Sequence, residues 1–239
     1  MKNERRISGS HTTRVVNDLG VAIISGRLAQ GSFLPGDVEL LRQYGVSRTV
    51  LREAVKTLAG KGLLQSKARR GTWVRERADW NLFDPDVLLW HASAGLSPAF
   101  LDHLGEMRLA LEPEAAALAA KRRTAAELAV MREFVEQMGA PNIDKDSFVR
   151  ADLGLHHAIA AAADNPFMLS VATLIEVALV AMLTISSPVE SRRRLNTSVA
   201  EHRAIVDAIE ARDSEAARAT MRVVINSGIT HSRKRQPAA

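Results

Sequence analysis

The sequence predicts a mainly α-helical protein in two parts: a winged helix-turn-helix over residues 1–77 and an antiparallel all-α bundle over residues 98–233. Apolar residues recur at helical spacing through most of the chain, and two short strand-like segments flank residue 70. Residues 1–77 contain 15 Lys and Arg against 6 Asp and Glu, whereas residues 78–239 contain 17 against 21. A basic piece joined to an acidic piece indicates that only the first meets a polyanion.

The composition narrows the class of protein further. With 239 residues, 46% of them hydrophobic, the chain can bury a sizeable core, and the lack of cysteine excludes disulfides, thiol catalysis and zinc–thiolate sites. The apolar run over residues 171–185 is interrupted by Glu176 and is short for a membrane span. No N-terminal run resembles a signal peptide. We therefore expect a cytoplasmic protein with no membrane partner.

Turn residues divide the first part into short elements. Gly31, Pro35 and Gly36 mark a connector between helices, and Gly45 is placed to end a short helix. Two segments rich in apolar and β-branched residues follow and are typical of a hairpin. The predicted elements are helices at residues 12–28, 37–44 and 47–60 and strands at residues 63–67 and 72–75.

The helix that begins at Ser47 carries the clearest functional pattern of this part. The Ser47 hydroxyl can cap it, and apolar residues at helical spacing mark its buried face: Leu51, Ala54, Val55 and Leu58. Arg48, Thr49 and Arg52 fall on the other face, where guanidinium groups could reach guanine edges or phosphates in the major groove of DNA. The alternative is a surface helix with solvated arginines.

The predicted hairpin adds a second basic feature. Arg69 and Arg70 stand beside Gly71 in its turn, where they could lie against phosphates or the minor groove. An ordinary exposed hairpin is the alternative. Because this hairpin follows three helices, the order predicts a winged helix-turn-helix that binds double-stranded DNA.

Residues 78–97 are predicted to bridge the two parts. Asp84 and Pro85 are typical of a helix start. Trp80, Phe83 and Trp90 are too large and apolar for a mobile linker, so we expect them to pack between the domains, with ligand stacking as the alternative. The tail over residues 234–239 is predicted to be disordered.

After residue 97 the chain is predicted to be helical almost throughout. Short links rich in Gly, Pro and Asn separate long apolar periodic segments, which is typical of an antiparallel bundle. The predicted helices are residues 98–122, 124–138, 144–163, 166–185, 191–212 and 214–233.

Three side chains of the bundle could hold a divalent metal ion. Asp152 and His156 are four residues apart on one predicted helix, so they share a face. His202 lies on a later predicted helix, and the spacing of apolar residues on that helix indicates that it packs into the bundle. Nitrogen and oxygen ligands from two helices indicate an accessible site, most simply for zinc, with nickel or manganese as alternatives. An ordinary polar pair between Asp152 and His156 is the other reading.

The N-terminal part resembles the DNA-binding domain of GntR-type transcription regulators. The resemblance spans residues 12–74 and rests on the Leu-Pro-x-x-x-x-Leu connector, on Val-Ser-Arg-Thr-Val-Leu-Arg-Glu-Ala and on Arg-Arg-Gly-Thr-Trp-Val. It implies that Ser47, Arg48, Thr49, Arg52 and the wing residues contact the operator. Val38 stands where the family often has another arginine that contacts DNA.

The bundle resembles the FCD effector domain of the FadR subfamily. The resemblance spans residues 98–230 and rests on Arg-Leu-Ala-Leu-Glu from Arg108, on Asp152-x-x-x-His156 and on Glu-His at His202. It implies that Arg108 faces a carboxylate effector and that a fourth ligand stands 22 residues after His202, where this chain has Val224. Ser227, one turn further, could face the same cavity.

Residues 80–90 and the missing fourth histidine are similar to a branch of this subfamily that responds to sugar acids. The resemblance therefore implies a homodimeric, ligand-responsive regulator, a repressor released by a small carboxylate such as a sugar acid. Two alternatives are a metal-dependent enzyme acting on small hydroxy acids and an architectural DNA-binding protein with an inert bundle. No motif for a general base supports the enzyme.

Overall fold

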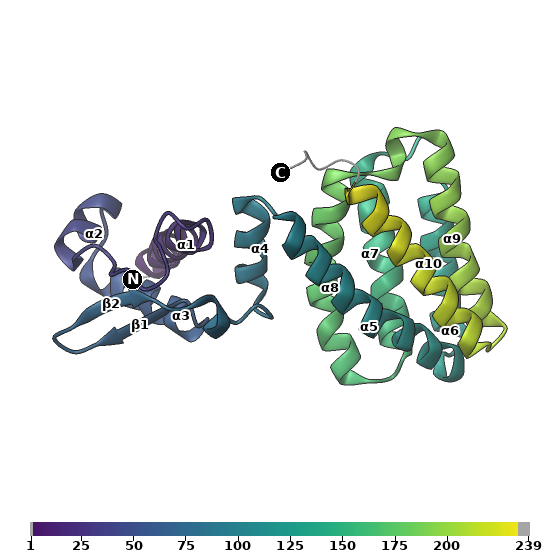
Figure 1. Ribbon diagram of the computed structural model, residues 1–239, viewed down its shortest axis with the longest axis horizontal. Coiled ribbons are helices and arrows are strands. Elements are labelled where there is room, and N and C mark those ends of the chain that lie inside the picture. The colour runs from purple at the N-terminus through teal and green to yellow at the C-terminus, as the bar shows by residue number, and fades with distance from the viewer. Residues whose placement is uncertain (1, 234–239) are drawn as a thin grey trace. The chain divides into compact units, whose positions relative to one another are not determined.

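The protein divides into two compact units, Met1–Leu96 and Ser97–Ala239. The computed structural model describes residues 2–233, with side chains described from residue 11 onward except at several positions between 173 and 185. The two units have the predicted class, a winged helix-turn-helix and an all-helical bundle (Figure 1). The predicted tail at residues 234–239 lies outside the described residues.

The N-terminal unit contains the predicted helices and hairpin in the predicted order. Its elements are α1 (Lys2–Ile24), α2 (Asp37–Tyr44), α3 (Arg48–Gly60), β1 (Leu64–Lys67), β2 (Gly71–Val74), η1 (Arg77–Asp79) and α4 (Pro85–Ala94). Helix α1 was expected at residues 12–28, but it begins at Lys2 and ends at Ile24. It ends early because Gly26 adopts φ of 78°, and the Leu28 amide then donates to the Ala22 carbonyl at 3.0 Å.

One apolar core joins all the helices of this unit to the hairpin. The strands pair antiparallel, with Lys67 opposite Gly71, and Phe33 in the connector bridges to Trp73. The buried side chains include Val15, Leu19, Ile23, Leu40, Leu51, Ala54, Leu58, Leu63, Val74, Trp80, Val87 and Trp90. The buried face of α3 is thus fixed against α1, which leaves its polar face turned outward.

Residues 78–97, predicted as a bridge, form η1 and α4, and their tryptophans pack inside the N-terminal unit. Trp80 and Trp90 are buried in its core, and Trp90 Nε1 donates to Asn17 Oδ1 at 3.1 Å. Both rings are therefore buried within the core of the N-terminal unit, and Trp90 packs against α1. Phe83 differs from both, because 61% of its surface is exposed.

The C-terminal unit is a helical bundle whose helices agree with the predicted ranges to within two residues. They are α5 (Pro98–Arg122), α6 (Ala125–Met138), α7 (Lys145–Ala162), α8 (Pro166–Ile185), α9 (Arg192–Glu210) and α10 (Ser214–Arg233), with a short η2 (Pro188–Glu190) before α9. Polar side chains cap the first turns as the sequence allows: Ser97, Thr124, Asp144 and Ser191.

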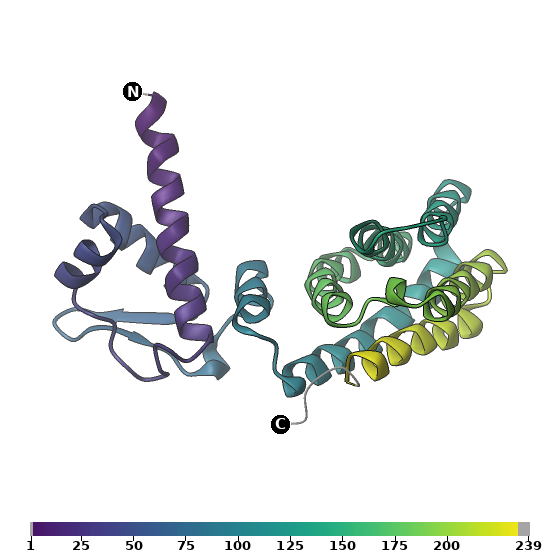
Figure 2. The ribbon, with the colours of Figure 1, turned by 90° about the horizontal axis from the view of Figure 1, so that it is seen from above.

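Helices α5 and α10 lie side by side and antiparallel in both views of the ribbon (Figures 1 and 2). Ser214 Oγ donates to the Ala117 carbonyl at one end of the pair, and Arg233 pairs with Asp102 at the other. Helices α7 and α9 contribute to the same apolar core, whose members include Phe148, Leu155, Ile159, Ile205, Ile209, Met221 and Ile225. None of the helices among the described residues is long and apolar enough to cross a membrane.

Candidate nucleic-acid interface and ligand cavity

The start of α3 presents its polar residues to solvent. Ser47 is the N-cap, and its Oγ accepts a hydrogen bond from the Val50 amide at 3.4 Å. Arg48, Thr49 and Arg52 are all exposed, while Leu51 behind them is buried. The structure therefore brings together the residues that the sequence assigned to the major groove. A capped helix whose first two turns carry two exposed guanidinium groups has the chemistry to bind phosphates and guanine edges.

The hairpin turn holds the predicted wing residues. Arg69 and Arg70 are exposed, and the Arg70 amide donates to the Lys67 carbonyl at 3.0 Å. Arg69 adopts φ of 63° and Gly71 φ of 97°, so both lie in the left-handed region that closes the turn. Glycine takes that conformation freely, whereas for arginine it is strained. On α2, Val38 is 76% exposed where a longer cationic side chain would reach further.

Asp152 and His156 on α7 meet His202 on α9 inside the bundle. One ligand atom from each lies within 4.8 Å of the others, and all three side chains are buried. The His156 and His202 rings meet edge to face, with centroids 5.7 Å apart. The structure thus brings together the three side chains that the sequence proposed as ligands. We refer to them as the Asp–His–His cluster.

The ring nitrogens of the cluster are oriented as metal binding requires. His202 Nδ1 donates to the Ser198 carbonyl at 2.7 Å, and His156 Nδ1 lies 2.5 Å from Glu112 Oε2. Each Nδ1 thus lies beside an oxygen, and each Nε2 faces the cluster, where His202 Nε2 lies 3.0 Å from Asp152 Oδ1. Asp152 Oδ2 and His156 Nε2 are buried and have no hydrogen-bond partner among the described residues. These unsatisfied atoms fit a divalent ion held by three protein ligands. Val224 occupies the position where the resemblance implies a fourth ligand.

Charges within the cluster shift the pKa values of its members. Burial alone would raise the pKa of Glu112, but the nearby Arg108 and His156 outweigh it and hold the pKa at about 2. Burial would also raise the pKa of Asp152, and the His202 ring reverses that and lowers it. Both carboxylates are therefore ionised at neutral pH.

Arg108 is buried, with 2% of its surface exposed, and it pairs with Glu112 one turn along α5. The sequence left open whether Arg108 faces an effector or pairs with Glu112. The structure shows the pair, and it also places Arg108 on the wall of a cavity that contains the Asp–His–His cluster. Glu112 joins Arg108 to His156, so it links the two candidate binding groups.

This polar cavity has a volume of about 390 Å³ and contains further polar side chains. Ser227 lines it, as the sequence suggested, and Ser227 Oγ donates to Glu201 Oε1 at 3.0 Å. His231 is half-buried and also lines the cavity. Its Nδ1 donates to the Ser227 carbonyl at 2.7 Å, one turn away on α10.

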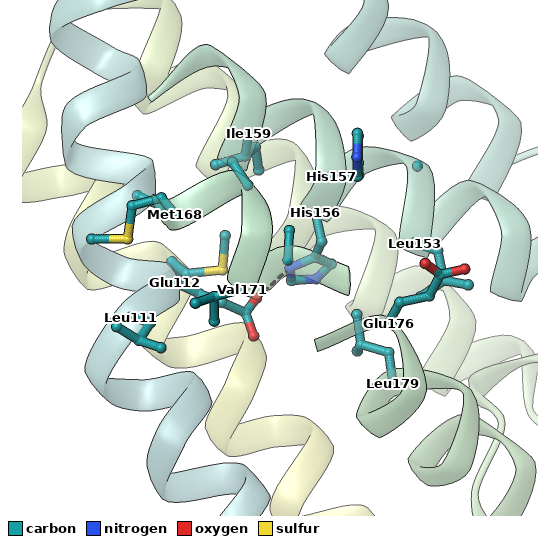
Figure 3. Close-up of a pocket in the computed structure, with 15 residues that line it drawn as sticks. Leu111, Glu112, Leu153, His156, His157, Ile159, Met168, Val171, Glu176 and Leu179 are labelled. Carbon is teal, nitrogen blue, oxygen red and sulfur yellow. Dashed lines mark ion pairs between the residues drawn. The ribbon is translucent and has the colours of Figure 1, made fainter. Parts of the chain in front are cut away.

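A second cavity of about 250 Å³ also has His156 in its lining and is mostly apolar (Figure 3). Glu112 and His156 point toward each other at its wall, and Leu111, Met168 and Val171 surround them. His157 points away from His156, as expected for the next residue on a helix. The apolar lining makes this second cavity less suited to an acid than the polar one.

Sequence reasoning missed several residues of the polar cavity. Arg193 and Arg194 line it from the first turn of α9, and Ser198 supplies the carbonyl that orients His202. Arg193 and Arg194 are consecutive basic residues, a signal that could have drawn attention to them. The role of Ser198 carried no signal, because a backbone carbonyl acts through geometry alone.

A winged helix-turn-helix joined to a helical bundle with an internal polar cavity is the architecture of a DNA-binding transcriptional regulator. Residues 11–74 match the model of bacterial regulatory proteins of the gntR family, and residues 103–227 match the FCD domain. The chain belongs to the GntR family of transcriptional regulators and carries an FCD domain; it is not an enzyme.

Relatives of known sequence match this chain along most of its length. The galactonate operon transcriptional repressor of Escherichia coli K12 is 32% identical over 206 residues, which cover 86% of this chain and 90% of that protein. The uncharacterized regulator YieP of the same strain is 36% identical, covering 83% of this chain and 85% of YieP. The repressor NanR of Klebsiella aerogenes is 30% identical, covering 85% and 78%.

Solved structures share the fold. Streptococcus agalactiae GntR superimposes with a TM-score of 0.52 at 24% identity, covering 92% of this chain and 99% of that one. Lar, which controls the expression of the Listeria monocytogenes agr system, gives a TM-score of 0.64 at 19% identity, covering 94% and 97%. At these identities the likeness shows a common architecture.

Proposed function

We propose that this protein is a homodimeric repressor that leaves its operator when a small carboxylate, most simply a sugar acid, enters the polar cavity. Its relatives include the galactonate operon repressor and the repressor NanR. The observation that carries the proposal is that one chain combines an exposed cationic helix start with a polar cavity whose ligand atoms are buried and unsatisfied.

DNA recognition is assigned to the first turn of α3 and to the wing. Arg48 and Arg52 have the length and charge to reach base edges and phosphates. Ser47 and Thr49 would offer hydroxyl groups to the same DNA. Arg69 and Arg70, beside Gly71, would neutralise phosphates and add to the salt dependence. Two copies in a dimer would read two half-sites whose spacing the dimer fixes.

Effector binding is assigned to the polar cavity. Asp152, His156 and His202 would hold a divalent ion, with zinc favoured by the mixed nitrogen and oxygen ligands and nickel or manganese as alternatives. That ion supplies positive charge to which an acid's carboxylate is attracted. Arg108, oriented by Glu112, would face the same carboxylate, and Ser227 would meet the acid's hydroxyls.

The two sites communicate by linkage. If the acid favours the arrangement of the dimer that fits the operator less well, the acid weakens DNA binding. The DNA then weakens acid binding by the same factor. Release from DNA therefore requires no direct contact between the acid and the recognition helix.

A fluorescence-anisotropy titration with DNA from upstream of the gene tests the proposal. We expect specific binding at moderate salt, weakened by galactonate in the presence of zinc and lost in the double variant Arg48→Ala/Arg52→Ala. The matched control is Lys145→Ala at the start of α7, in the other unit, which should bind DNA as the unmodified protein does. Absence of sequence-specific binding would overturn the regulator's operator role.

A further inference from the structure

Two arginines at the start of α9 form a part of the polar cavity that the binding of one carboxylate leaves unused. Arg193 and Arg194 line the cavity together with Arg108 and the Asp–His–His cluster. Whereas Arg108 pairs with Glu112, no carboxylate of the described residues forms an ion pair with Arg193 or Arg194. The cavity wall thus includes two arginines, the exposed Arg193 and the half-buried Arg194, that form no ion pair with the described residues.

Arg194 is held in place. Its Nη2 donates to the Ser186 carbonyl at 3.2 Å and to Ser186 Oγ at 2.9 Å. Ser186 is itself buried, with 6% of its surface exposed. Arg194 Nε is buried and has no hydrogen-bond partner in the described part of the chain. A buried donor without an acceptor is unfavourable, and an anionic group in the cavity would satisfy it.

With a divalent ion bound, the cavity would carry excess positive charge that favours an acid with more than one negative charge. Arg108, Arg193 and Arg194 on the cavity wall carry three positive charges, and three carboxylates carry the negative ones: Asp152 and Glu201 on the wall and Glu112, which pairs with Arg108. A divalent ion in the cluster would then leave two positive charges uncompensated. The amide end of α9, a helix of 19 residues, adds partial positive charge beside Arg193 and Arg194.

We propose that the cavity has a second anion subsite at Arg193 and Arg194, so that its effector carries two acidic groups, as the dicarboxylic form of a sugar acid does. One group would lie at the Asp–His–His cluster and Arg108, and the other at α9. The volume of about 390 Å³ falls within the range of small-molecule sites, roughly 300–1,000 Å³. This inference rests on the proposed function of the cavity as the effector site.

Calorimetry on the purified, zinc-loaded full-length protein tests the subsite. The probes are galactonate and galactarate, which share a carbon skeleton and differ by a carboxylate at carbon six. We expect galactarate to bind about 10-fold more tightly or better, because a charge-assisted pair with an arginine is worth at least that factor. A phosphorylated galactonate is the third probe; tighter binding than galactarate would support the subsite and identify its group as phosphate.

Variants show which residues carry the preference. Arg193→Gln and Arg194→Gln should each weaken galactarate binding more than galactonate binding and reduce the preference for galactarate to about twofold or less. Arg192→Gln, in the same turn but outside the cavity wall, is the matched control and should keep the preference. Arg193 donates no side-chain hydrogen bond to the described residues, so its variant stays informative if loss of the Arg194–Ser186 contact destabilises the fold.

The outcomes separate the two proposals. If galactonate binds but galactarate binds no better, or if the variants weaken both acids equally, the second subsite is refuted and the effector role of the cavity stands. If the unmodified protein binds DNA but none of the three acids, then both the sugar-acid effector and the subsite are refuted.

Discussion

Glu112 contacts both candidate binding groups of the bundle, because its carboxylate pairs with Arg108 and lies 2.5 Å from His156 Nδ1. At the scale of single residues, it therefore decides whether His156 presents Nε2 to a metal. Sequence spacing pointed to Asp152 and His156 as ligands because both lie on one helix. It did not identify Glu112 as the orienting group, because that contact depends on how closely α5 approaches α7.

Glu112→Gln is predicted to weaken zinc binding about 10- to 100-fold, because the carboxylate that orients and polarises His156 is lost while all three ligands remain. A competition titration against a chelator measures this at a temperature well below unfolding, since Arg108 loses its partner in this variant. Glu114→Gln is the control: Glu114 lies on the same helix but pairs with Arg218 at the surface. Equal zinc affinity in the two variants would contradict the assignment.

The arginines of the DNA-binding unit are predicted to differ in what they contribute. Arg48→Ala should lose roughly 1–3 kcal/mol of discrimination between operator and unrelated DNA, because it removes a base-edge contact.

Arg70→Ala should weaken both DNAs alike and reduce the slope of log affinity against log salt by about 0.9. Anisotropy titrations at several salt concentrations measure both quantities. An unchanged salt slope for Arg70→Ala would rule out its phosphate contact.

At the scale of elements, most helices could be predicted because their apolar spacing and cap residues agree. Thr124 with Glu127 forms a reciprocal capping box at the start of α6, a local pattern that is visible in sequence. The exceptions depend on distant contacts. Trp90 packs on Gly20, and His231 reaches the polar cavity, only because α4 meets α1 and α10 runs along α5.

Gly154 is predicted to set the distance between α6 and α7. A Cβ at this position would meet the Phe134 ring at 2.3 Å, so Gly154→Ala should destabilise the bundle by about 1–3 kcal/mol despite alanine's higher helix propensity. Gly228→Ala on α10 is the control, because nothing lies within 4 Å of its added Cβ. Urea unfolding followed by far-UV circular dichroism compares them, and a Gly154→Ala protein as stable as the control would contradict this packing.

At the scale of the whole molecule, the two units can be followed separately. All three tryptophans lie between residues 73 and 90, inside the N-terminal unit, so tryptophan fluorescence reports on that unit alone. Far-UV circular dichroism is dominated by the longer helices of the bundle. Comparing the two signals therefore assigns a loss of stability to one unit or the other.

The N-terminal unit is predicted to lose stability in acid because of His91. Burial, together with the nearby charge of Arg77, lowers the pKa of His91 to about 4. The unfolded chain therefore binds a proton at His91 more readily than the folded unit does. The free energy of unfolding is unaffected by this difference above about pH 6.5, and it falls as the pH drops from 6.5 toward 4. We expect a loss of about 1–2 kcal/mol between pH 7 and 4.5, a value reduced for solvent screening.

Tryptophan fluorescence during urea unfolding at each pH measures that loss. His91→Gln should flatten the dependence for the N-terminal unit, because glutamine does not titrate in this range. An equally steep dependence in His91→Gln would contradict the assignment.

The left-handed backbone of Arg69 at the wing tip sets two selective pressures against each other. Glycine or asparagine would adopt φ of 63° with less strain, so variants chosen for thermal resistance alone should replace this arginine. Variants chosen for tight operator capture should keep it. A library randomised at position 69 would thus converge on different residues under the two selections, and the wing tip would be a place where folding and recognition compete.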